Sequence, residues 1–269
     1  MVKLRLLSSI AVLAALTVSV SAQVVFYADF EDNSSNAIPG PEVNELAAWD
    51  PDNDGQIWEL AAHPGTGNQG LFNSQEGCGT SGNTPLPGVT DFSDGTIQLL
   101  MATSDDDSFG VIFRKSGDSA GYLVMFGTIE TPAVIVARLD DGCGANGQCA
   151  DESGCENGGA ELLQVEHGIE DIAQDNTTVL VGRIEAMGSS IKVWYVDLAT
   201  VSDPNGDLGA PLIEISDSTH AAGSVGVWHE SMGLSFVDDI LVTGPDGITA
   251  VEANGKLATY WGSVKTASQ

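Results

Sequence analysis

The chain has 269 residues, of which 38 are acidic and only nine are Lys or Arg, so its formal net charge at pH 7 is −29. This balance excludes nucleic-acid binding as a function class, because such binding depends on Lys and Arg side chains that neutralise phosphates. The acidity instead suits a divalent cation, or a solvated surface in a salty medium where charges are screened.

The first 22 residues have the pattern of a secretory signal peptide. Lys3 and Arg5 precede an apolar run over residues 6–20, and Val20-Ser21-Ala22 provides small residues at a cleavage site. The apolar run is too short for a membrane-spanning helix, and no later stretch offers 18 unbroken apolar residues. We therefore expect a secreted or cell-surface protein whose mature chain begins at residue 23 and has no transmembrane segment.

The mature chain predicts short β-strands separated by turns. Runs rich in β-branched and aromatic residues are cut off by Gly, Pro, Asp and Ser. The expected strands cover residues 24–30, 56–61, 96–102, 109–114, 122–126, 133–139, 161–167, 179–185, 191–197, 224–229 and 234–242, with a further short one near 70–72.

These signals predict an all-β fold of about ten to twelve strands with few or no helices. One sheet of that many strands needs a second layer to bury its apolar face, which indicates a two-sheet antiparallel β-sandwich. We place this single domain at residues 23–243 and treat residues 244–269 as a C-terminal tail with a different composition.

Four cysteines point to two disulfide bonds in an exported chain. Cys78 stands apart, whereas Cys143, Cys149 and Cys155 share one loop that lacks apolar periodicity. One bridge within that loop and one from it to Cys78 would account for all four, and the three connectivities remain open. Zinc is the alternative, but the closely spaced cysteine pairs and the partner histidine of a zinc site are missing.

Alternating acids match the first half of an oxygen-rich calcium loop. Asp50, Asp52 and Asp54 alternate, and Gly55 permits the sharp turn that such a loop requires. Ala61 stands where the loop needs a bidentate Glu. Two interpretations stay open here, a calcium site and a solvated Asp-Gly turn.

A second acidic cluster precedes the strand predicted at 109–114. The adjacent carboxylates of Asp105, Asp106 and Asp107 repel one another unless a cation or water lies between them. Ca²⁺ accepts six to eight oxygen ligands and would relieve this repulsion. Glu31 and Asp239, at the ends of the first and last strands, would share another ion if those strands pair; otherwise they are separate solvated edges.

Two stretches of the sequence resemble catalytic patterns. Residues 117–121 read Gly-Asp-Ser-Ala-Gly, but a nucleophile elbow needs a helix after its turn, and a strand is predicted instead. We therefore interpret these residues as a hairpin turn. Glycoside hydrolysis needs two carboxylates at a fixed separation, and the acids within residues 166–170 and 214–217 approach that pattern poorly.

Several short motifs resemble the concanavalin A-like lectin and glucanase superfamily, and most closely its LamG-like and thrombospondin C-terminal-like jelly rolls. The motifs are residues 105–114, a tyrosine-bearing strand at Tyr122, and residues 223–228 and 234–242. The resemblance implies a jelly roll whose first and last strands are neighbours, often with structural calcium and with glycan or protein ligands. The Glu-x-Asp-x-Glu run of the superfamily's retaining glucanases is missing from this sequence.

We therefore expect a non-catalytic, calcium-stabilised protein that binds carbohydrate or another extracellular partner. Sugar rings stack on exposed aromatic side chains, and we predict Trp228 and Tyr122 as ligand-binding residues. The first alternative is a glycoside hydrolase-like enzyme on the same fold. The second is a structural protein of an envelope or matrix.

Overall fold

The computed structural model describes residues 24–30, 58–73, 81–117, 120–139, 159–170, 172–230 and 233–246. Several sequence predictions concern residues outside these ranges and stay predictions. They are the signal peptide, the four cysteines (Cys78, Cys143, Cys149 and Cys155), the metal candidates Glu31, Asp50, Asp52 and Asp54, and the tail beyond residue 246.

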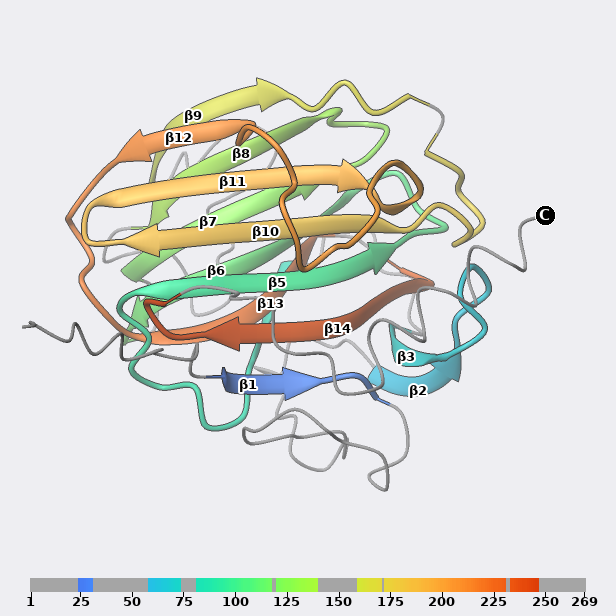
Figure 1. Cartoon of the computed structure of the whole chain (residues 1–269), viewed down its shortest axis with the longest axis horizontal. Helices are drawn as coiled ribbons and strands as arrows, with labels where there is room; N and C mark the ends of the chain where they lie inside the picture. Colours follow the sequence, from blue (N-terminus) through green and yellow to red (C-terminus); the bar gives the residue numbers. More distant parts are fainter. Residues whose placement is uncertain are drawn as a thin grey trace, which may run out of the picture.

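An eight-stranded antiparallel sheet forms one layer of the molecule (Figure 1). Its order is β12-β11-β10-β5-β14-β3-β2, and β1 also pairs with β14. The strands are β1 (Val24–Ala28), β2 (Trp58–Ala62), β3 (Gln69–Asn73), β5 (Gly95–Ala102), β10 (Leu180–Met187), β11 (Ser190–Asp197), β12 (Ile213–Ser216) and β14 (Ser235–Thr243).

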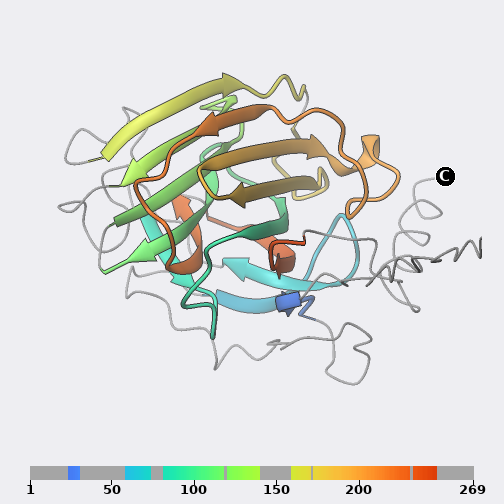
Figure 2. The ribbon, with the colours of Figure 1, turned by 60° about the vertical axis from the view of Figure 1, so that its left-hand side comes forward.

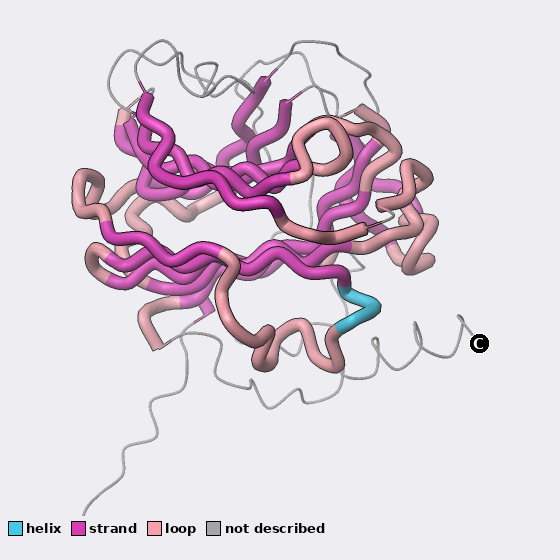
Figure 3. Tube along the Cα trace, turned by 90° about the horizontal axis from the view of Figure 1, so that it is seen from above, coloured by secondary structure: helices cyan, strands magenta, loops and turns pink. Residues whose placement is uncertain are grey.

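A six-stranded antiparallel sheet forms the second layer, in the order β4-β13-β6-β7-β8-β9. The strands are β4 (Ser81–Pro85), β6 (Ser108–Ser116), β7 (Ala120–Gly127), β8 (Ala133–Leu139), β9 (Gly159–Glu166) and β13 (Ser224–Glu230). The two sheets lie face to face (Figures 2 and 3). The predicted all-β, two-sheet sandwich is confirmed.

All twelve expected strands are present, and two more, β4 and β12, were not predicted. Within the described ranges the one helical element is the short 3-10 turn η2 (Leu198–Thr200), and none is long and apolar enough to span a membrane. Residues 118 and 119 lie outside the described residues, but β6 and β7 are consecutive antiparallel strands with Ser116 opposite Ala120, so a strand and not a helix follows this connection, as the hairpin prediction requires.

The first and last described strands are neighbours, as the family resemblance implied. Ala28 lies opposite Ile240, and Tyr27 lies opposite Leu241. The pairing of β14 with β5 is interrupted between Asp238 and Leu241, where Asp239 has a φ of 47°. This irregularity separates the part of β14 that pairs with β3 from the part that pairs with β1.

Alternating side chains of both sheets fill the space between the layers. Phe113, Tyr122 and Phe126 of the six-stranded sheet join Ile97 and Val193 of the opposite sheet in one buried cluster. Phe113 and Tyr122 are stacked, with ring centroids 5.3 Å apart. Because successive strand residues point to opposite faces, these residues define the inner faces of both sheets.

The prediction that Trp228 is a surface residue is wrong. Trp228 is 0% exposed and lies on the face of β13 that points away from the inner cluster. Its indole ring covers Gly110 of the neighbouring strand so closely that a Cβ at position 110 would lie 2.8 Å from Trp228 Cε3. An aromatic side chain that is fully covered cannot present its face to a sugar ring.

The outer face of the eight-stranded sheet is covered by the connection from β11 to β12. Arg183 of β10 is buried beneath it, where the guanidinium donates to the carbonyl oxygens of Gly206 and Pro204 and to Gln98 Oε1. Burial lowers the pKa of Arg183 to about 10, against the opposing effect of nearby acids such as Asp203. The arginine therefore fixes this connection to the sheet as a cation.

Candidate functional site

The turn that joins β5 to β6 carries the predicted acidic cluster. Thr103 directly follows β5, and its hydroxyl accepts a hydrogen bond from Asp105 N at 2.7 Å and donates to Asp105 O at 2.8 Å. Thr, Ser and Asp favour such turns because their short polar side chains bond to nearby backbone groups. The local sequence thus explains why the chain turns here and why three acids follow one another on the turn.

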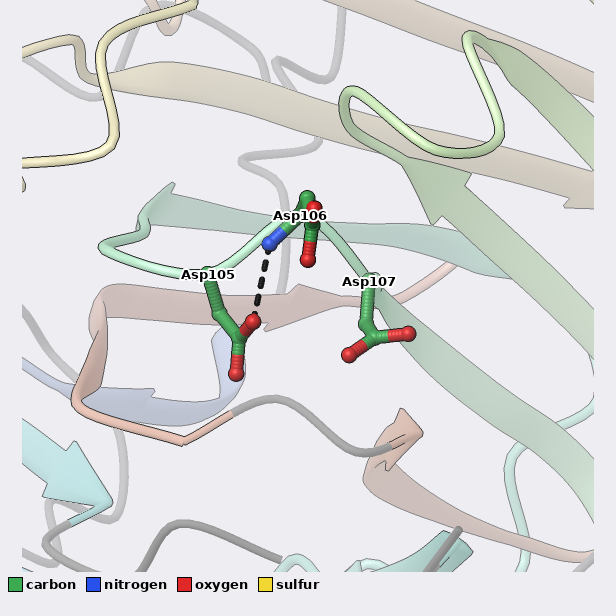
Figure 4. A group of neighbouring side chains, drawn as sticks. All are labelled: Asp105, Asp106 and Asp107. Carbon is green, nitrogen blue, oxygen red and sulfur yellow. Dashed lines mark hydrogen bonds between the residues drawn. The ribbon is translucent and has the colours of Figure 1, made fainter. Parts of the chain in front are cut away.

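The three aspartates bring their carboxylates together. Asp105, Asp106 and Asp107 each offer one oxygen, and these oxygens all lie within 4.8 Å of one another. Figure 4 shows the carboxylates of Asp105 and Asp107 on the same side of the turn, with Asp106 between them. Two oxygens on opposite sides of one Ca²⁺ ion are about 4.8 Å apart, so this spacing fits a single ion.

Neighbouring segments hold the acidic turn in place. Asp105 Oδ2 accepts from Gly233 N, and Asp105 Oδ1 accepts from Asp106 N, each at 3.0 Å. Thr128 Oγ1 donates to the carbonyl oxygen of Asp107 at 2.6 Å, and Glu130 N donates to that of Asp106 at 3.0 Å. The turn is therefore fixed by the β7–β8 connection and by the segment that precedes β14.

The chemistry of this cluster matches a hard cation. All three donors are carboxylate oxygens, which suit Ca²⁺ or Mg²⁺, whereas zinc prefers nitrogen and sulfur ligands. The three side chains are only partly buried, so water or a ligand has access to an ion held by them. Three monodentate carboxylates would leave three or more of the six to eight coordination positions of calcium open.

A second layer of polar residues supports the acidic turn from the side of the eight-stranded sheet. Asn176 N donates to Thr103 O, and Asn176 Nδ2 donates to Leu234 O, both at 2.9 Å. Asn176 has a φ of 61°, a conformation that asparagine tolerates better than most residues. Sequence reasoning assigned it no role at this site, and its tolerance of the left-handed conformation was the available signal.

His63 lies beside this layer and is a structural residue. Its ring contacts Phe236 at a centroid distance of 4.7 Å, and its Nδ1 accepts from Gly65 N and Thr66 N, each at 3.1 Å. Burial lowers the pKa of His63 to about 4. The imidazole is therefore neutral at pH 7 and fixes the turn that follows β2.

Tyr122, predicted as a ligand-binding residue, is buried between the sheets near the N-terminal end of β7, whereas the acidic turn contacts Thr128 just after the C-terminal end of that strand. Its side chain is 0% exposed, and its hydroxyl donates to Asp217 Oδ1 at 2.5 Å and accepts from His220 N at 3.2 Å. Arg138 Nη1 donates to Asp217 Oδ2 at 3.3 Å. The observed contacts of Tyr122 therefore join the two sheets instead of facing a ligand.

The predicted metal residue Asp239 is not gathered with the acidic turn. Asp239 is 9% exposed and accepts a 3.0 Å hydrogen bond from the Tyr27 hydroxyl. Among the described residues, the group of acids close enough together to bind one ion contains only Asp105, Asp106 and Asp107. Its predicted partner Glu31 lies outside the described residues. Within the part of the chain that the structure describes, the metal candidate is therefore the turn at residues 105–107.

Comparisons with known proteins found matches among solved structures alone. No protein-family model matches the chain, and no curated protein matches it. The carbohydrate-binding module CBM66 from Bacillus subtilis shares 15% identity, covering 73% of this chain and 92% of its own, with a TM-score of 0.44. A Crh5 transglycosylase in complex with NAG shares 11% identity, covering 83% and 86%, with a TM-score of 0.45.

The exoplasmic domain of VIP36, in a form bound to Ca²⁺ and Man3GlcNAc, shares 7% identity, covering 74% of this chain and 84% of its own, with a TM-score of 0.49. At these identities and TM-scores the likeness concerns sandwich architecture and assigns neither a family nor a ligand to this chain. The LamG-like and thrombospondin-like subclasses stay predictions.

Proposed function

We propose that this chain is an exported, non-catalytic β-sandwich protein that binds neutral saccharides through a calcium ion held by Asp105, Asp106 and Asp107. The observation that carries the proposal is the convergence of three carboxylate oxygens within 4.8 Å on one turn. Like charges at such distances repel strongly unless a cation lies between them. A divalent ion at this position offsets the repulsion and cross-links the loops that contact the turn.

The charge of the chain favours uncharged ligands over anionic ones. At a formal net charge of −29, the protein repels polyanions such as sulfated glycans and nucleic acids at distances shorter than the Debye length, beyond which salt screens the charges. A partly exposed calcium ion with open coordination positions binds neutral oxygen ligands, and vicinal sugar hydroxyls supply two such oxygens at once. Neutral saccharides are therefore the ligand class that fits both the ion and the surface.

The arrangement of the acids supports binding over hydrolysis. A retaining glycosidase places its two carboxyl groups about 5–5.5 Å apart, and an inverting one about 6.5–9.5 Å apart, on either side of the scissile bond. The clustered carboxylates here approach within 4.8 Å and all come from one turn. That arrangement holds an ion but does not place an acid and a base on opposite sides of a sugar.

Binding of the mature chain to a glycan array, in CaCl₂ and in EGTA, tests the proposal. We expect binding to neutral saccharides that EGTA abolishes, and equal loss in the variant Asp105→Asn, Asp106→Asn, Asp107→Asn. A charge-matched control replaces three exposed acids elsewhere, Asp91→Asn, Glu170→Gln and Asp246→Asn, and should bind as the wild type does.

Two outcomes would contradict the proposal. Saccharide binding that persists in EGTA and in the triple variant would show that the acidic turn is not the site. No binding to any glycan, with calcium-dependent capture of an extracellular protein instead, would assign the site to a protein partner.

A further inference from the structure

The connection from β11 to β12 covers only part of the outer face of the eight-stranded sheet. It lies over β5 and β10, where Asn205 Oδ1 accepts from Gln98 Nε2 and Arg183 donates to two carbonyl oxygens of the connection. Figure 1 shows the connection crossing β10 and β11, with the turn that joins these two strands lying well beyond the crossing. The part of β10 and β11 near their shared turn is therefore not covered by this connection.

Five side chains of this part of the sheet share one face. Glu185 of β10, Lys192 of β11 and Glu214 of β12 lie opposite one another in register, so all three point to the same side. Met187 and Trp194 are two residues along from Glu185 and Lys192, and they point to that side as well. The residues between them belong to the buried cluster between the sheets, so this side is the outer one. We call these five residues the hairpin face.

Apolar surface is accessible at both ends of the hairpin face. Met187 is 38% exposed, and in the described part of the chain only Ile129 is another large apolar side chain exposed to that extent. Trp194 is partly exposed, and its indole N–H donates to Gly209 O at 2.9 Å, which fixes the orientation of the ring. A ring that is already held in place loses little conformational entropy when a ligand stacks on it.

The charged row between Met187 and Trp194 contains one more carboxylate than it has cations. Lys192 Nζ lies 3.4 Å from Glu185 Oε1, and both side chains are partly exposed. Glu214 is exposed and lies opposite Lys192, but it forms no ion pair with any described residue. The formal net charge of −29 adds a negative potential over the whole surface. The hairpin face therefore attracts cations.

We propose that the hairpin face docks a cationic segment of a protein partner, with one arginine side chain stacked on Trp194 and a second one paired with Glu214. A guanidinium group stacks on an indole ring, whose negative face attracts the cation, and it also binds carboxylates through two N–H groups. Trp194 and Glu214 are diagonal neighbours on adjacent strands, about 7–8 Å apart. Alternate residues of an extended chain lie about 6.8 Å apart on one side, so an extended Arg-x-Arg segment reaches both.

Charge favours this partner over others that could cover an exposed tryptophan. A second copy of the chain carries the same net charge of −29 and the same acidic row, so two such faces repel each other. A neutral saccharide could stack on Trp194, but it would leave the Glu214 carboxylate without a cation. A cationic segment uses both the ring and the carboxylate. The hairpin face shares no residue with the acidic turn, so this docking is independent of the calcium site.

The indole N–H signal of Trp194 in NMR spectra of isotope-labelled protein tests the docking. The variant Trp194→Phe identifies this signal by its absence. The probe is the peptide acetyl-Arg-Ser-Arg-amide, and the control peptide carries citrulline, which is neutral and close to arginine in shape. We expect the arginine peptide to shift the signal saturably, both in CaCl₂ and in EGTA, and the citrulline peptide to leave it unchanged.

Single substitutions separate the hairpin face from the general attraction of an acidic protein for a cationic peptide. Glu214→Gln should raise the peptide Kd read from the Trp194 signal by roughly two- to fivefold, the effect of one exposed ion pair. Glu170→Gln is the matched control, because Glu170 is an exposed glutamate that follows β9 of the other sheet, and its Kd should equal that of the wild type. Trp194→Leu should raise the Kd read from the Met187 methyl signal by roughly two- to fivefold.

Three results would overturn the proposal. The first is a Trp194 signal that the arginine peptide does not shift, or that both peptides shift equally. The second is an equal Kd for the Glu214→Gln and Glu170→Gln variants. The third is a shift caused by neutral saccharides and not by the arginine peptide, which would assign the ring to a sugar-binding site instead.

Discussion

The hydroxyl of Tyr27 donates a 3.0 Å hydrogen bond to Asp239 Oδ1, and this contact joins the first strand of the eight-stranded sheet to its last described strand. Burial, together with the nearby carboxylates of Asp239 and Asp29, raises the pKa of the Tyr27 hydroxyl far above its usual value. The tyrosine is therefore a proton donor at every pH at which the protein is folded.

Removal of this hydroxyl should destabilise the protein. Tyr27→Phe leaves the buried Asp239 carboxylate without its tyrosine donor, which should cost about 1–3 kcal/mol in the free energy of unfolding. Asp239→Asn keeps an acceptor oxygen at the same position and should cost less. Urea unfolding measures both, and equal stability of the Tyr27→Phe variant and the wild type would contradict the assigned role.

Gly110 should not tolerate a side chain, because Trp228 lies on it. A Cβ at position 110 would lie 2.6 Å from Val124 O and 2.8 Å from Trp228 Cε3, both too close. We expect Gly110→Ala to reduce the free energy of unfolding by about 1–3 kcal/mol through overpacking. Gly70→Ala is the control, since its nearest contact would be 3.3 Å from the Phe236 ring. Similar stability of the two variants would contradict this packing.

Stability should fall as the pH drops from about 6.5 to 4, and His63 should contribute to the fall. The folded pKa of His63 is about 4, below the value of about 6.5 in an unfolded chain. In this window the unfolded state binds a proton at His63 that the folded state does not, so stability is lost as the pH falls.

The variant His63→Asn tests this, because Asn Oδ1 can accept the same backbone hydrogen bonds but does not titrate. Urea unfolding between pH 7.5 and 4.5 should show a shallower loss in the variant. His167, whose pKa is also lowered by burial, contributes equally in both proteins. Identical slopes in the wild type and the variant would rule out titration of His63 as a cause.

Tyr122→Phe should lower stability without altering ligand binding. Burial opposes the ionisation of Asp217, but hydrogen bonds from Tyr122, Thr219 and Arg138 outweigh it and lower the pKa of Asp217 to about 2. The resulting stabilisation, about 1–2 kcal/mol after solvent screening, is present above about pH 4 and lost as the pH falls toward 2.

Acid unfolding of the Tyr122→Phe variant should therefore begin at a higher pH than that of the wild type. Glycan binding at pH 7, measured on the same preparation, should be unchanged. Loss of glycan binding in a variant that remains folded would restore Tyr122 as a ligand-binding residue.

The sequence contains a signal that argues against the wrong prediction of Trp228 as a surface residue. Alternation along a strand indicates that one face is buried and the other is exposed, and Trp228 was placed on the exposed side. Other strands of the same sheet, however, are almost continuously apolar, as in Leu123 to Phe126 of β7 and Ala133 to Ala137 of β8. Continuous apolar runs are typical of strands that are covered on both faces.

The two strands that the sequence did not predict depend on pairing with distant residues. β4 reads Ser-Gly-Asn-Thr-Pro and carries no apolar alternation, and it forms because Asn83 and Thr84 pair with Trp228 and Val227 of β13. β12 has only four residues and pairs with β11 at the edge of the sheet. Local propensity is a weak guide where pairing with another strand determines the structure.

The candidate site was only partly predictable from the sequence, because part of it also depends on residues that are distant in the chain. The mutual repulsion of Asp105, Asp106 and Asp107 is a property of the local sequence, so a candidate cation site at these residues could be predicted. Their fixation depends on Thr128 and Gly233, which are distant in the sequence and reach the turn only through the sandwich topology. No local pattern identifies such partners.

The central claim, a calcium ion at the Asp105–Asp107 turn, is tested most directly by thermal unfolding of the mature chain in CaCl₂ and in EGTA. At a calcium concentration 100-fold above the Kd, binding adds about 2.7 kcal/mol, which corresponds to a Tm increase of roughly 5–10 °C for a domain of this size. We expect that increase in the wild type and in the charge-matched control, and none in the Asp105→Asn, Asp106→Asn, Asp107→Asn variant. An unchanged wild-type Tm, or an equal increase in the triple variant, would contradict the claim.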